Sequence, residues 1–196
     1  MKTYKKTTTT TEKRLVINND NGASSPRDWT NLGYFITVDR NYSSPDENET
    51  METIIRDTGD ESENIEEHMK GIIDGIEFET GDKVIAIYPI TKYEHSGISY
   101  SLGTAHGFDN SNNGFYIITE NSLKEVGAKK ENFESIIEDE INYYNKWLNG
   151  EVYNFTLLNN KGEIKDSGYG FYSMNEIKKS LPEEWQNEDM SEYLEE

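Results

Sequence analysis

Apolar residues gather in four short runs that have the length and composition of β-strands. The runs cover residues 32–38, 84–88, 98–102 and 115–119, and they are rich in β-branched and aromatic side chains. Pro89 follows the second run and Gly114 precedes the fourth, so turn formers mark their ends. Short apolar or alternating runs bounded by such residues predict strands in a folded core.

Two further segments predict a hairpin. Residues 152–158 and 163–172 flank the turn-forming sequence Asn159-Asn160-Lys161-Gly162. An Asn- and Gly-containing connection of this length favours a tight turn between antiparallel strands. Residues 14–17 add a shorter apolar run that predicts an earlier strand.

Helical spacing occurs in two other segments. Apolar residues recur at intervals of three and four, which places them on one face of a helix. The first set is Ile65, Met69, Ile72, Ile73 and Ile76, and the second is Phe133, Ile136, Ile137, Ile141, Tyr144 and Leu148. Short connections between strands favour antiparallel pairing. The sequence therefore predicts an α+β fold, with an antiparallel sheet of six or seven strands and two main helices packed on one face.

The polar segments suggest where this domain begins and ends. Residues 1–12 are a low-complexity Lys/Thr segment that we expect to be disordered. We expect one α+β domain over residues 13–173, with an acidic insertion at residues 41–80, and an acidic tail over residues 174–196.

Composition narrows the class of protein. Hydrophobic residues make up 33% of the 196 residues and aromatic residues 12%, so the chain has enough large side chains for a core. Cysteine is absent, which excludes disulfides and thiolate chemistry. No segment has the roughly 20 apolar residues of a membrane span, and no signal peptide is visible. We expect a soluble protein of the cytoplasm.

Charge adds the strongest indication of function. The formal net charge is −19, and residues 41–80 alone contribute −11. Such a field repels nucleic acid and membranes and attracts basic proteins, although solubility alone is an equally good explanation. We expect a basic partner to contact nine acidic residues of this segment: Asp46, Glu47, Glu49, Glu52, Asp60, Glu61, Glu63, Glu66 and Glu67.

Histidines between the predicted strands offer an alternative. Tyr93, His95, His106 and Asp109 lie in the connections after two strands, where an imidazole can act as a general base oriented by a carboxylate. The spacing of the histidines fits no compact metal motif. Ordinary strand connections with backbone-bonded histidines explain these residues better, so we expect no catalytic residue and no metal.

Motifs for cofactors are also missing. The glycines near residue 107 lack the lysine and the strand–helix context of a phosphate loop, and the acidic segments lack the residue order of an EF-hand. We expect no cofactor.

Several short motifs together resemble a group of small acidic proteins encoded by bacteriophages and mobile elements. They are Pro26-Arg27-Asp28-Trp29 with Asn31-Leu32-Gly33, Tyr93 with His95-Ser96-Gly97-Ile98, Asp109 with Gly114-Phe115, Tyr144 with residues 148–153, and Asp166-Ser167 with residues 170–172. The resemblance covers residues 26–172 and implies a phage-type origin, but no catalytic residues.

Two hypotheses follow. The first is an inhibitor of a host defence system, of the anti-CRISPR or anti-restriction type, that acts in the host bacterial cell and binds a CRISPR effector or restriction nuclease through acidic residues that imitate nucleic acid. The sequence also admits a homodimer. The second is a small enzyme or nucleotide-binding protein that uses His95, His106 and Asp109.

Overall fold

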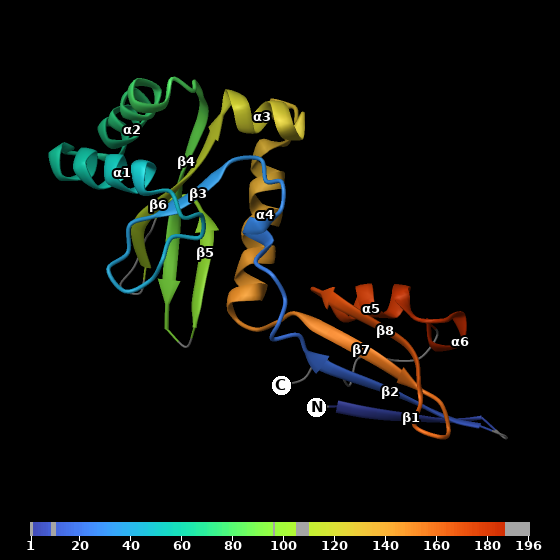
Figure 1. Ribbon diagram of the computed structural model, residues 1–196. Coiled ribbons are helices and arrows are strands. Elements are labelled where there is room, and N and C mark those ends of the chain that lie inside the picture. Colours follow the sequence, from blue (N-terminus) through green and yellow to red (C-terminus); the bar gives the residue numbers. More distant parts are fainter. Residues whose placement is uncertain (1, 9–10, 96, 105–109, 187–196) are drawn as a thin grey trace. The chain divides into compact units, whose positions relative to one another are not determined.

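The computed structural model describes residues 2–8, 11–95, 97–104 and 110–186 (Figure 1). The chain forms two compact units. Unit 1 combines Met1–Ser25 with Lys146–Glu196, and unit 2 is Pro26–Asn145. The structure thus divides residues 13–173 between two units instead of the one domain that we expected, because the strand containing residues 14–17 pairs with residues 153–158.

Unit 2 is built on a four-stranded antiparallel sheet with the order β3-β6-β4-β5. The two central strands contain the longest apolar runs, and bulges interrupt their pairing after Val84 and after Ile90. The apolar pattern located all four strands, but β4 continues through Pro89 and β6 begins before Gly114, so two of the predicted strand ends were wrong. The strands are β3 (Tyr34–Thr37), β4 (Val84–Glu94), β5 (Ile98–Leu102) and β6 (Asn110–Thr119).

Helices cover both faces of this sheet, not one face as we expected. On one face, α1 (Glu49–Glu61) and α2 (Ile65–Thr80) pack their buried isoleucines against Ile36 and Ile117 (Figure 1). On the other face, the Phe35 ring lies 5.6 Å from the ring of Tyr144 of α4 (Phe133–Leu148). Successive strand residues point to opposite faces, so neighbouring Phe35 and Ile36 reach different helices.

Glycine allows α1 and α2 to pack closely. A Cβ atom on Gly75 would lie 2.8 Å from Ile54 Cγ2, and one on Gly71 would lie 3.0 Å from Thr58 Cγ2. Gly75 and Gly71 therefore mark where α2 meets α1, and any larger residue there would push the helices apart.

Unit 1 contains the second four-stranded antiparallel sheet, with the order β1-β2-β7-β8. Its core joins Leu15 and Phe155 of the sheet to Ile177 and Trp185, which lie beyond the predicted domain. The residues that we expected to form a disordered start and an acidic tail thus include regular elements. The elements of unit 1 are β1 (Lys2–Thr8), β2 (Thr11–Asn19), β7 (Tyr153–Leu158), β8 (Ile164–Phe171), α5 (Met174–Ser180) and α6 (Glu183–Gln186).

The α+β class is confirmed, since both sheets are antiparallel and helices pack against each. Unit 2 also contains α3 (Glu120–Val126) and two short 3-10 helices, Pro26–Asp28 and Lys130–Asn132. Within the described ranges, no helix combines the length and the apolar character needed to cross a bilayer.

Candidate protein-binding surface

The acidic segment folds into two adjacent helices, α1 and α2, which we call the acidic hairpin (residues 49–80). It carries eleven acidic and two basic side chains, a net charge of −9. Seven of the nine carboxylates predicted to contact a partner are exposed on it or beside it: Glu47, Glu49, Asp60, Glu61, Glu63, Glu66 and Glu67. Glu52 is half-buried.

These carboxylates are not neutralised by neighbouring bases in the part of the chain that the structure describes. The two bases of the acidic hairpin, Arg56 and Lys70, are exposed, and the recorded ion pairs join residues outside it. The packing of α1 and α2 against the sheet therefore leaves a surface on which negative charge is concentrated.

The position of the acidic residues along each helix distinguishes those that stabilise the helix from those that do not. Glu49 and Glu66 lie in first turns, where a carboxylate interacts favourably with the positive end of the helix dipole. Asp60 and Glu61 lie in the last turn of α1, and neither helix has a base in its last turn. Acids at a helix C-terminus oppose the dipole, so local stability explains the first group and not the second.

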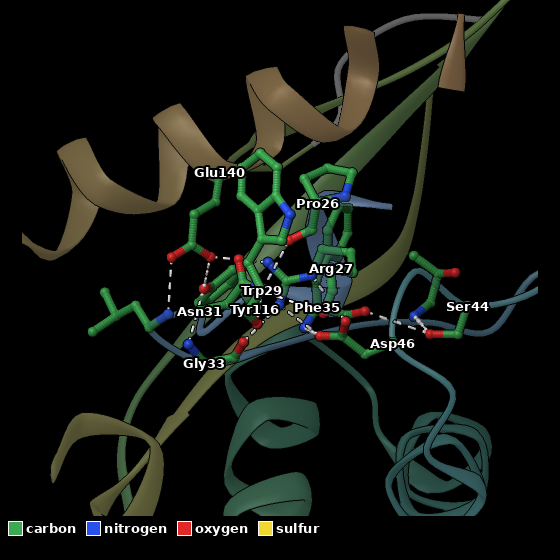
Figure 2. Close-up of polar contacts among 12 residues, drawn as sticks. Pro26, Arg27, Trp29, Asn31, Gly33, Phe35, Ser44, Asp46, Tyr116 and Glu140 are labelled. Atoms are coloured by element: carbon green, nitrogen blue, oxygen red, sulfur yellow. Dashed lines mark hydrogen bonds and ion pairs between the residues drawn. The ribbon is translucent and has the colours of Figure 1, made fainter. Parts of the chain in front are cut away.

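Asp46 differs from the other predicted contact residues because an internal arginine engages its carboxylate (Figure 2). Arg27 Nε donates to Asp46 Oδ1 over 2.8 Å, and Arg27 Nη2 donates to Asp46 Oδ2 over 2.6 Å. The backbone N–H of Phe35 donates to the same Oδ2 over 2.6 Å. A bidentate pair of this kind fixes both groups, so Asp46 holds the loop before α1 in place. We leave it out of the candidate surface.

The same arginine connects β3 and its preceding loop to α4. Arg27 Nη1 donates to Glu140 Oε2 over 2.9 Å, and the Tyr116 hydroxyl donates to that oxygen as well. Glu140 Oε1 accepts the backbone N–H of Leu32 over 2.8 Å, and the Tyr116 hydroxyl oxygen accepts that of Gly33 over 2.9 Å (Figure 2). We call Arg27, Asp46, Tyr116 and Glu140 the Arg27 network.

Electrostatics keep the Arg27 guanidinium charged and the Tyr116 hydroxyl protonated. Burial disfavours the charged form of Arg27, but the hydrogen bond and charge of Asp46 outweigh it and raise the arginine pKa above its ordinary value. Burial, followed by the charge of Glu140, raises the pKa of Tyr116 above its ordinary value. The Arg27 side chain is only 3% exposed and each of its three nitrogens donates within unit 2, so the network stabilises the fold and is not a site for a ligand.

The acid on α4 was detectable from spacing, although we did not predict its role. Glu140 lies three residues after Ile137 and four before Tyr144, so it falls on the apolar stripe of the helix. A carboxylate at such a position needs a buried partner. Arg27 gave no comparable signal, because its partners are distant in sequence.

A second buried base lies on β4. Lys92 Nζ donates to Asp39 Oδ2 over 2.6 Å and lies 2.8 Å from Glu94 Oε2, while the Tyr42 ring is 4.1 Å from Nζ. Burial by itself lowers the pKa of Lys92. The hydrogen bonds to the two carboxylates raise the pKa by more than burial lowers it, so the net effect is an increase. The ammonium group stays charged, which excludes Lys92 as an amine nucleophile near neutral pH.

The residues of the alternative enzyme hypothesis are only partly described. Tyr93 and His95 are exposed at the end of β4, with ring centroids 6.4 Å apart. His106 and Asp109 lie outside the described residues. The remaining histidine, His68, donates from Nε2 to the Ile55 carbonyl over 2.8 Å and packs edge-on against Phe115, so its role is structural.

Metal binding has no geometric support in the described ranges, where no three His, Asp or Glu side chains gather closely enough to hold an ion.

Comparisons of the chain with protein-family models, with curated proteins and with solved structures found no match. Among the described residues, the acidic hairpin is the surface whose charge favours a binding role.

Proposed function

We propose that this protein is a phage- or mobile-element-encoded inhibitor of a host defence nuclease, of the anti-CRISPR or anti-restriction type. It acts in the bacterial cytoplasm by placing the acidic hairpin against the basic channel that normally holds nucleic acid. The phage-type origin rests on the motifs from Pro26 to Tyr172, and the binding mode rests on charge.

One observation carries this proposal: exposed carboxylates that have no basic partner among the described residues are concentrated on one hairpin, including at a helix end where they oppose the dipole. A 16-residue helix is about 24 Å long, so the hairpin has about one net negative charge per 2.7 Å. Duplex DNA has one per about 1.7 Å of its axis. The two charge densities are of the same order. A channel whose basic side chains bind phosphates at the higher density therefore has enough of them to pair with the carboxylates of the hairpin.

The test is a binding titration against purified CRISPR effectors and restriction nucleases at increasing salt. We expect affinity to fall steeply between about 50 and 300 mM NaCl, because exposed charge pairs are screened over about 10 Å at 0.1 M. We expect the triple variant Asp60→Lys, Glu61→Lys, Glu63→Lys to bind at least about tenfold more weakly, since several rim charges then repel the partner.

The matched control is Glu151→Lys, Glu163→Lys, Asp166→Lys, which changes the net charge equally at exposed positions of unit 1. It should retain most of the affinity. His95→Ala separates the enzyme hypothesis, because it should leave inhibition intact. Equal losses in both triple variants, or affinity that does not respond to salt, would contradict the proposal.

A further inference from the structure

Phe78 is an exposed aromatic residue within the acidic hairpin. Its exposed fraction is 85%, against 51% for Trp29 and 71% for Tyr169. It follows the buried Ile76 by two residues, which corresponds to about 200° around the helix at 3.6 residues per turn. The packing that buries Ile76 against the sheet thus directs Phe78 away from the core.

Folding gives no reason for phenylalanine at this position. Its ring gains almost nothing from burial in unit 2, and phenylalanine has a lower helix propensity than the glutamates on either side. An exposed ring in the last turn of an acidic helix is the kind of residue that anchors a protein interface, since aromatic side chains dominate interface energetics once a partner covers them.

Carboxylates surround this ring along the chain. Asp74 lies one turn before Phe78, Glu77 and Glu79 are its neighbours, and Asp82 follows just beyond the helix. Glu77 Oε1 accepts the backbone N–H of Val84 over 3.0 Å, and Asp82 Oδ1 accepts that of Asn121 over 3.3 Å. Asp74 and Glu79 are both exposed, and Asp74, four residues before Phe78, lies on the same face of α2 as the ring.

This combination selects one side chain above the others. The planar guanidinium of arginine stacks on an aromatic face and pairs with carboxylates through two donors at once, whereas the lysine ammonium is a compact, strongly hydrated point charge. We propose that Phe78, with Asp74 one turn before it, is the docking point for an arginine of the basic partner. This inference rests on the proposed function and specifies which base the acidic hairpin recognises.

The test uses the full chain with two synthetic probes, a nona-arginine and a nona-lysine peptide, titrated by calorimetry in 50 mM NaCl. We expect the protein to bind nona-arginine more tightly than nona-lysine. We expect Phe78→Ala to weaken nona-arginine binding by about threefold to fivefold, as loss of an exposed cation–π contact implies, and to reduce the preference for arginine. Phe78→Leu, which keeps an apolar side chain without a ring, should behave like Phe78→Ala.

Tyr169→Ala is the control, because it removes an exposed aromatic side chain from unit 1 and should leave both affinities unchanged. Circular dichroism should show unaltered helix content for Phe78→Ala, whose side chain lies outside the core. Unchanged nona-arginine binding by Phe78→Ala would overturn this inference and leave the proposed function standing. Failure of the unmodified protein to bind either peptide at low salt would overturn both.

Discussion

Arg27 contacts acceptors from three separate segments of unit 2. Its guanidinium reaches the loop before α1 through Asp46, α4 through Glu140, and the Gly33 carbonyl at 2.7 Å. Asp46 lies 19 residues and Glu140 lies 113 residues from Arg27 along the chain. A single side chain thus connects parts of unit 2 that the backbone does not, and its removal leaves two carboxylates partly buried without a counter-charge.

We expect Arg27→Met to lower the free energy of unfolding by about 3–5 kcal/mol, since breaking a buried ion pair from one side costs that much. Urea denaturation followed by circular dichroism measures the change. The control Arg56→Met removes an exposed arginine of α1 and should change stability by less than about 0.5 kcal/mol. Similar stabilities for the two variants would show that the Arg27 network contributes little.

For single residues, the sequence predicts which side chains are exposed better than it predicts which side chains contact each other. The exposed carboxylates of the acidic hairpin were predictable as surface residues, because charged side chains are rarely buried. The role of Asp46 was not, since nothing in its neighbourhood distinguishes it from Glu47 or Glu49. Its partner is set by tertiary contacts, and only the position of Glu140 on an apolar stripe signalled a buried polar network.

Among the elements, α1 and α2 show how local and long-range signals differ. The spacing of Ile65, Met69, Ile72 and Ile76 correctly predicted α2. The α1 segment has fewer apolar positions, so the apolar pattern did not mark it as one of the two main helices, whereas α1 has 13 residues. Its helical structure depends on the Asn48 N-cap, on packing of Met51 and Ile55, and on α2 as a neighbour.

Strand positions were predictable from local apolar runs, but strand partners were not. The division into two sheets follows from the pairing of β2 with β7, in which Ile17 lies opposite Phe155. No turn connects these strands, so no local feature specifies the pair. The predicted single sheet and single domain were wrong for this reason, and the α+β class was right because it depends only on element types.

The last turn of α1 yields a prediction about stability. We expect Asp60→Lys with Glu61→Lys to raise the free energy of unfolding by about 0.5–2 kcal/mol, because each base replaces an acid at the negative end of the helix dipole. Thermal unfolding at low salt measures the change. Glu66→Lys with Glu67→Lys makes the same charge change in the first turn of α2 and should lower stability.

Such a result would separate stability from binding. The double variant in α1 should be more stable than the unmodified protein and yet bind the basic partner more weakly. If Asp60→Lys with Glu61→Lys destabilises the protein, then the acids at the end of α1 have a structural role, which would contradict their assignment to binding alone.

For the whole molecule, buried phenols link stability to high pH. Burial raises the pKa of Tyr100 to about 12 and that of Tyr144 to about 12, while an unfolded chain ionises tyrosine near pH 10. Above about pH 10 the unfolded state loses these protons and the folded state keeps them. The stabilising contribution is therefore complete below about pH 10 and is lost as the pH rises through the folded-state values.

We expect the free energy of unfolding to be nearly constant from pH 8 to about 9.5 and to fall above pH 10, by at most about 1.4 kcal/mol per pH unit for each phenol. Urea titrations across this range measure the slope. Tyr144→Phe should make the fall shallower, and Tyr169→Phe, which changes an exposed phenol, should not. A profile with the same slope in all three proteins would contradict this assignment.

The interleaving of the two units along the chain has a consequence for biosynthesis. Unit 2 is a continuous segment, whereas β2 of unit 1 finds its partner β7 only after all of unit 2 has been translated. On the ribosome the acidic hairpin and its sheet can thus fold first. During that time β2 lacks its partner β7, and the apolar side chains of Leu15 and Ile17 are not covered by the core of unit 1. Slower translation would lengthen the interval before β7 is synthesised. A chaperone that binds the nascent N-terminal strand would reduce the exposure of its apolar side chains during that interval.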